Sequence, residues 1–269
     1  PAGVGRRVRW RAVSIVDIAG AYLDALVTRD PSAVALRDDV RRTTNARVGV
    51  RGADALRESI RHEPQVSLEG RRWIAAGDTA AVFYDLTHHP SPAGDAVPVY
   101  IGERFAVVDG AIAEIEAVYA VGPVVRPPRP DRHPTAPDAA TVDVADAADA
   151  RPGEPGRVLE AARAYLAALV SHDASGVAAT DDVWRVENGA VTADGAEALR
   201  SSLESAIMET VVGIDDERWL AAGDQAAVFY TLHADVGGPD PMPVRIAERF
   251  RAVDGRLAEI EAVFAPIGD

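Results

Sequence analysis

Apolar residues near the start of the chain recur at the spacing of one face of an α-helix. Ser14 and Asp17 resemble a capping box, and the apolar stripe that follows them includes Tyr22. The stripe returns later in the chain with Tyr165. A short second helix and a third helix over residues 52–61 follow, again with later counterparts. We therefore predict three N-terminal helices in each half of the chain.

After the helices the apolar pattern changes to a period of two, which is typical of strands. Gly77-Asp78 and Asp109-Gly110 interrupt the alternation as tight turns, so two hairpins are expected. Helices followed by a meandering antiparallel sheet make an α+β fold, in which the curved sheet leaves a pocket beneath the helices. The strands predicted in the first half are 40–45, 73–76, 79–86, 97–107 and 111–119.

The chain repeats itself once. Ala75-Ala76-Gly77-Asp78 returns as residues 221–224, and residues 114–118, Glu-Ile-Glu-Ala-Val, return as 259–263. So long a period indicates a duplicated domain and not a solenoid. The predicted divisions are an N-terminal extension (1–13), a first domain (14–121), a linker (122–156) and a second domain (157–269).

The predicted linker is set apart by its composition. Eight of the 18 prolines fall within 122–156, and most other residues there are Ala, Asp or Arg. Such a segment has little apolar surface to bury, and its prolines favour extended conformations.

Composition narrows the chemistry. The 269 residues carry a formal net charge of −14 and include neither Cys nor Lys, so thiolate and Schiff-base chemistry are excluded. Residues 157–269 hold 20 acidic residues against 9 arginines, so most of the acidity lies in the second domain. This balance argues against nucleic acid or an anionic membrane as a partner. With no pattern of an export signal or membrane span, we expect a cytoplasmic protein.

Several of the repeated motifs carry a family resemblance. Ala21-Tyr22-Leu23, the Ala-Gly-Asp turn, Glu103-Arg104-Phe105 and the closing Glu-Ile-Glu-Ala-Val are similar to the SnoaL-like branch of the nuclear transport factor 2-like superfamily. The resemblance covers almost everything outside the linker and the N-terminal extension. It implies two tandem cone-shaped α+β barrels, each with an apolar pocket. It also implies that the first domain packs on the second as a pseudo-dimer within one chain, alone or in a further homo-oligomer.

A glutamate lies on the apolar face of one strand in each copy. Glu103 and Glu248 alternate in phase with apolar neighbours, whereas Arg245 and Arg249 share the opposite face, which we therefore expect to be exposed to water. Burial would raise the pKa of such a glutamate into the range useful for a general acid or base. A structural carboxylate, hydrogen-bonded by a tyrosine, an arginine or backbone amides, is an equal alternative.

Glu116 and Glu261 lie on the strand paired with that one, and the pattern leaves their direction open. If Glu116 faces Glu103, the two would share a proton as coupled carboxylates do. A solvated face is the interpretation that the pattern favours.

Tyrosines and other polar residues complete the set of candidates. Tyr22 and Tyr165 are candidate catalytic donors to a developing oxyanion. Tyr84 and Tyr230 fit a core position better than a ligand contact. Trp73 and Trp219 fit either the pocket wall or sheet packing. Histidines show no metal-ligand spacing, so no metal is expected. Candidate ligand contacts are Trp73, Trp219, Tyr84, Tyr230, Arg41, Asn45, Asn188, Glu116 and Glu261.

Two functions are consistent with these residues. The first is an acid–base enzyme without a cofactor, which isomerises, cyclises, hydrates or hydrolyses a hydrophobic polyketide- or terpenoid-like molecule through Glu103 or Glu248. The resembled superfamily includes polyketide cyclases, ketosteroid isomerases and limonene epoxide hydrolases. It also includes proteins that only bind, so the alternative is a non-catalytic ligand-binding or scaffold protein.

Overall fold

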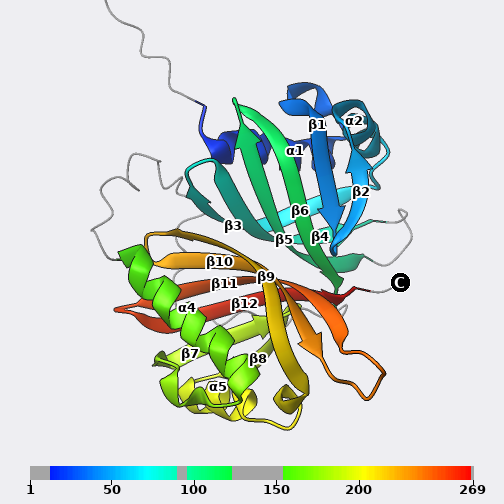
Figure 1. Cartoon of the computed structure of the whole chain (residues 1–269). Coiled ribbons are helices and arrows are strands. Elements are labelled where there is room, and N and C mark those ends of the chain that lie inside the picture. The colour runs from blue at the N-terminus through cyan, green and yellow to red at the C-terminus, as the bar shows by residue number, and fades with distance from the viewer. Residues whose placement is uncertain (1–12, 90–95, 123–153, 268–269) are drawn as a thin grey trace, which may run out of the picture.

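A computed structural model describes residues 13–89, 96–122 and 154–267 and contains two domains of the same architecture (Figure 1). Nearly all of the predicted N-terminal extension and linker lie outside the described residues. The helix that opens the second domain begins at residue 154, slightly before the predicted boundary. Within the described residues, no helix is long and apolar enough to cross a membrane.

The first domain opens with the predicted helix. The Ser14 hydroxyl accepts a hydrogen bond from the Asp17 amide at 3.1 Å, and the Asp17 carboxylate accepts one from the Ser14 amide at 3.1 Å, which confirms the capping box. The elements of this domain are α1 (Ile15–Thr28), the one-turn 3₁₀-helix η1 (Pro31–Ala33), β1 (Leu36–Thr44), β2 (Arg47–Arg51), α2 (Ala53–Arg61), β3 (Val66–Ala76), β4 (Thr79–His88), β5 (Val97–Val108) and β6 (Ala111–Val121).

The second domain repeats this order, with one additional 3₁₀ turn before its long strands. Its elements are α4 (Glu154–Ser171), η2 (Ala174–Gly176), β7 (Ala179–Glu187), β8 (Ala190–Asp194), α5 (Ala196–Leu203), η3 (Met208–Thr210), β9 (Val211–Ala222), β10 (Gln225–Ala234), β11 (Met242–Val253) and β12 (Arg256–Pro266).

Each domain has one six-stranded sheet, with the order β2-β1-β6-β5-β4-β3 in the first and β8-β7-β12-β11-β10-β9 in the second. The predicted α+β class is confirmed, but the sheet is mixed and not wholly antiparallel, because β1 pairs parallel with β6 and β7 with β12. The helices also do not precede the sheet as a block, since the β1–β2 hairpin lies between η1 and α2.

The inner face of each sheet packs against the helices of its own domain and forms the core. In the first domain the ring of Tyr22 on α1 meets that of Phe105 on β5 edge-on, with centroids 5.6 Å apart. Tyr165 and Phe250 repeat the contact at 5.5 Å in the second domain. The aromatic pairs fix the first helix over the sheet in both copies.

The outer faces of the two sheets pack against each other (Figure 1). β6 lies against β12 and β3 against β9, and the ring centroids of Phe83 and Phe229 are 6.4 Å apart. Gly102 lies so close to Ala247 that a β-carbon at residue 102 would overlap the alanine methyl. The outer faces are therefore an interface between domains and not solvent-exposed surfaces.

The expectation that the arginine face of β11 is exposed to water is wrong. Arg245 and Arg249 are only 1% and 4% exposed, because the other domain covers this face. A buried guanidinium requires an acidic partner. The predicted solvation of Glu116 and Glu261 is wrong for the same reason, since both glutamates lie in this interface and bind its arginines.

Glu116 receives arginines from both domains. Its carboxylate accepts hydrogen bonds from Arg218 Nη1 at 2.6 Å and from Arg245 Nε at 3.0 Å, both in the second domain. Arg104 of its own domain donates from Nε at 3.1 Å. In the pseudo-symmetric place, Glu261 accepts from Arg72 of the first domain at 2.6 Å. These charge-assisted bonds hold the two sheets back to back.

Removing the charge of Glu116 should weaken the joined domains. We expect Glu116→Gln to lower the free energy of unfolding by about 3 kcal/mol, because buried arginines would lose their counter-charge. Urea unfolding measures the change. Glu114→Gln is the matched control, because Glu114 also binds Arg104 but its side chain is 27% exposed, and its loss should cost less than about 1 kcal/mol. Equal losses in the two variants would contradict this assignment.

Candidate functional site

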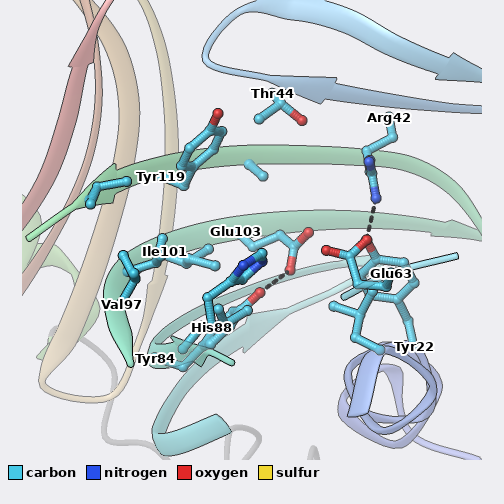
Figure 2. Close-up of a pocket in the computed structure, with 15 residues that line it drawn as sticks. Tyr22, Arg42, Thr44, Glu63, Tyr84, His88, Val97, Ile101, Glu103 and Tyr119 are labelled. Carbon is cyan, nitrogen blue, oxygen red and sulfur yellow. Dashed lines mark hydrogen bonds between the residues drawn. The ribbon is translucent and has the colours of Figure 1, made fainter. Parts of the chain in front are cut away.

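A cavity of about 470 Å³ lies in the first domain between the inner face of the sheet and α1 (Figure 2). This volume is within the usual range of small-molecule sites. Seven of the fifteen residues in the wall are aliphatic, and the other eight carry polar groups, three of them as tyrosine hydroxyls. The residues that line it are Tyr22, Leu26, Arg42, Thr44, Glu63, Tyr84, Leu86, His88, Val97, Val99, Ile101, Glu103, Ala117, Tyr119 and Val121.

Glu103 reaches this cavity from β5, as its alternation with apolar residues predicts. The side chain is buried, and the Tyr84 hydroxyl on neighbouring β4 donates a hydrogen bond to Glu103 Oε2 at 3.0 Å (Figure 2). Burial raises the pKa of Glu103 to about 7, although the Tyr84 hydrogen bond and the Arg42 charge act in the opposite direction. Near neutral pH this carboxyl can therefore both donate and accept a proton.

Arg42 and Tyr22 form a second polar pair in the same cavity. Arg42 on β1 donates from Nη1 to the Tyr22 hydroxyl at 3.3 Å (Figure 2). Burial, followed by the charge of Glu103, raises the pKa of Tyr22, so the phenol stays neutral and can donate its own proton. The Nε of Arg42 is buried and meets no hydrogen-bond partner among the described residues.

The second domain contains the same glutamate, tyrosines and arginine, but its arginine has more hydrogen-bond partners. The Tyr230 hydroxyl donates to Glu248 at 2.9 Å, and burial raises the pKa of Glu248 to about 8, with Glu187 adding to the rise. Arg185 Nη1 donates to the Tyr165 hydroxyl at 3.2 Å. Unlike Arg42, however, Arg185 is held by further side chains of its own domain.

The sequence predicts Glu103, Tyr22 and Tyr84 of this site, but not its arginine. Glu103, Tyr22 and Tyr84 meet in the cavity of the first domain, where Tyr84 contacts the cavity although its sequence position favours the core. Arg41 is predicted to contact a ligand, but the cavity-lining residue of β1 is its neighbour Arg42. Polar residues occupy both faces of this strand, so alternation alone gives no phase. The polar cavity residues that the sequence does not predict are Arg42, Thr44, Glu63, His88 and Tyr119.

The strand and turn residues predicted to contact a ligand lie elsewhere. Arg41 faces away from the cavity and lies 3.7 Å from Glu114. Asn45 and Asn188 have left-handed backbone angles (φ 47° and 46°) in the turns after β1 and β7. Their side chains bind the main chain of the neighbouring strand, at Tyr119 in the case of Asn45, so they fix these turns.

The tryptophans and the paired-strand glutamates have structural contacts. Trp73 packs on Phe105 at 6.4 Å between ring centroids, and Trp219 stacks on Phe250 at 6.5 Å. Neither Trp73 nor Glu116 is among the residues that line the described cavity. Glu116 and Glu261 lie on the opposite face of the sheet, so the alternative in which Glu116 shares a proton with Glu103 is wrong.

A family model matches the chain twice, over residues 9–119 and 155–264. This chain belongs to the DUF8021 family, a domain of unknown function. The two matched ranges establish a tandem pair of DUF8021 domains and agree with the repeat seen in the sequence. A comparison with curated proteins finds no match.

Solved structures similar to this DUF8021 protein each align with about one domain. An epoxide hydrolase of the LEH-like type from M. tuberculosis is 21% identical (39% of this chain, 82% of that one, TM-score 0.36). An NTF2-like protein of unknown function from Cytophaga hutchinsonii is 11% identical (41% and 93%, TM-score 0.35). A protein with a ketosteroid isomerase-like fold from Catenulispora acidiphila, in complex with trimethylamine, is 15% identical (38% and 83%, TM-score 0.34).

The raised pKa of Glu103 predicts a specific pH dependence of stability. The folded chain retains a proton on Glu103 up to a pH of about 7, whereas the unfolded chain loses it near 4.5. Stability from this group is therefore present below 4.5 and is lost as the pH rises through about 7, by about 3 kcal/mol in all.

Glu103→Gln removes this titration. Between pH 4.5 and about 7, the free energy of unfolding of the wild type should therefore fall by about 3 kcal/mol relative to that of the variant. Urea unfolding at a series of pH values measures the difference. Glu58→Gln, an exposed residue on α2, should follow the wild-type curve. Parallel curves for wild type and Glu103→Gln would show that Glu103 titrates normally.

Proposed function

We propose that the first domain binds a largely apolar small molecule and that Glu103 exchanges a proton with it, in an isomerisation, cyclisation or hydration that needs no cofactor. The observation that carries the proposal is the buried Glu103–Tyr84 pair in the wall of a ligand-sized cavity. A carboxyl with a pKa of about 7 in such a place is suited to general acid–base catalysis.

Each polar group has a part in such a reaction. Glu103 accepts a proton from a substrate carbon, or from a water molecule that adds to the substrate, and then donates that proton to another atom of the substrate. Tyr84 holds the carboxyl in place through its hydrogen bond. Tyr22 faces the same cavity and donates to an oxygen on which negative charge develops, and the hydrogen bond from Arg42 holds the Tyr22 hydroxyl in place. The aliphatic residues of the wall hold the body of the substrate.

A binding protein is the second candidate, and one observation favours it. The glutamate–tyrosine pair is repeated in the second domain, where Tyr230 binds Glu248 at 2.9 Å. A pair that stabilises both domains equally would be a structural device, with the cavity serving only for binding. The two candidates differ in what happens to a bound molecule.

Carbon-bound deuterium detects proton exchange before the product is known. We expect the wild-type chain in heavy water to place deuterium in, or add water to, some members of a panel of apolar ketones and enones, as read by mass spectrometry. Glu103→Gln should lower this rate by at least about 100-fold while the same molecules still bind.

Glu248→Gln is the matched control, because it makes the same change in the second domain and should retain the wild-type rate. A wild-type rate in Glu103→Gln would exclude Glu103 as the proton carrier. Binding of panel members without exchange in the wild type would favour the binding protein.

A further inference from the structure

The two domains offer an internal comparison at one buried arginine. Arg42 and Arg185 occupy the same position, because each lies three residues before the left-handed asparagine, Asn45 or Asn188, that ends its strand. Each donates from Nη1 to the tyrosine of the first helix, at 3.3 Å in the first domain and 3.2 Å in the second. Their other partners differ.

Arg185 is fully engaged by side chains of its own domain. Its Nε donates to the Thr192 hydroxyl at 2.9 Å, its Nη2 donates to the Ser202 hydroxyl, and the carboxylate of Glu187 lies 3.5 Å from Nε. Its exposed fraction is 2%. The guanidinium charge is thus compensated entirely from within the domain.

Two substitutions remove this compensation in the first domain. Thr44 pairs with Ala117 as Glu187 pairs with Ala262, so Thr44 stands where the second domain has its carboxylate. Gly49 stands at the bulge position of the second hairpin strand, where Thr192 supplies the hydroxyl. Among the described residues, no acidic side chain forms an ion pair with Arg42, and its Nε meets no acceptor.

The same substitutions leave room beside the arginine. Arg42 and Thr44 both line the cavity of the first domain. Aliphatic side chains also line the cavity, with Leu86, Val99 and Ile101 among them. Figure 2 shows Ile101 on the side of the cavity away from Arg42. Glu63 and Glu103 also line this cavity, but among the described residues neither carboxylate forms an ion pair with Arg42. Its guanidinium can therefore bind an anionic group of a ligand whose remaining surface is apolar.

We propose that the ligand of the first domain carries a carboxylate on an apolar body, and that the part of the Arg42 guanidinium that lines the cavity binds this carboxylate beside Thr44. Because Nε of Arg42 is itself buried, the contact is assigned to the part of the guanidinium that lines the cavity. Carboxylate and guanidinium are matched in shape and charge. The proposal deepens the proposed function and rests on it.

Decanoate and 1-decanol are the probes, because they share an apolar chain and differ in charge. Calorimetry on the full chain, at a pH above the decanoate pKa and below that of Glu103, should give decanoate at least about tenfold tighter than 1-decanol. Thr44→Glu copies the second domain and should abolish this preference, whereas 1-decanol affinity should agree between Thr44→Glu and Thr44→Gln within about threefold. Thr44→Gln is the isosteric neutral control and should keep the preference. Circular dichroism confirms that each variant is folded.

His88 is the other basic side chain in the cavity wall, so His88→Gln is tested in parallel and should keep the preference. Equal affinity for the two probes in the wild type would overturn the carboxylate proposal while leaving an apolar binding cavity intact. Loss of the preference in His88→Gln, or equal effects of Thr44→Glu and Thr44→Gln, would also overturn it. Failure of both probes to bind would instead count against the binding cavity itself.

Discussion

The ion pairs between Glu116, Glu261 and the arginines of the facing domain are the interaction on which the rest of the structure depends. In β5, alternation places Glu103 on one face of the sheet and Arg104 on the other. The arginine face can be buried only against carboxylates, and the domain interface supplies them. The outer face of the sheet is thereby covered by the other domain, which holds the strands in place while the inner face curves around the cavity.

The sequence predicts much of each domain but not the contact between the domains. Capping at Ser14, the turns of the hairpins and the inward direction of Glu103 follow from local patterns that the structure confirms. Alternation tells which residues share a face and says nothing of what covers that face. The arginines on β11 therefore led us to expect a solvent-exposed face, whereas the sheet of the first domain covers that face. The sequence does not predict Arg42 as a site residue, because polar residues occupy both faces of β1 and alternation cannot tell which face lines the cavity.

Duplication allows one copy to keep polar groups that line a cavity, while the same groups in the other copy are hydrogen-bonded by side chains of that domain. In the second domain Thr192, Ser202 and Glu187 bind Arg185 as a ligand would. A satisfied polar cluster stabilises a domain, whereas an incompletely satisfied one costs stability and is retained where it binds something. This difference supports the proposal that the first domain holds the functional site and the second supports it, although both retain the glutamate–tyrosine pair.

The most direct measurement of this division is a crystal structure of the full chain grown with decanoate. We expect one decanoate per chain, in the cavity of the first domain, with its carboxylate within hydrogen-bonding distance of Arg42 and its alkyl chain along the aliphatic wall. Arg185 should keep its bonds to Thr192 and Ser202. Decanoate in the second domain, or a carboxylate directed to His88 with Arg42 uncontacted, would contradict the assignment.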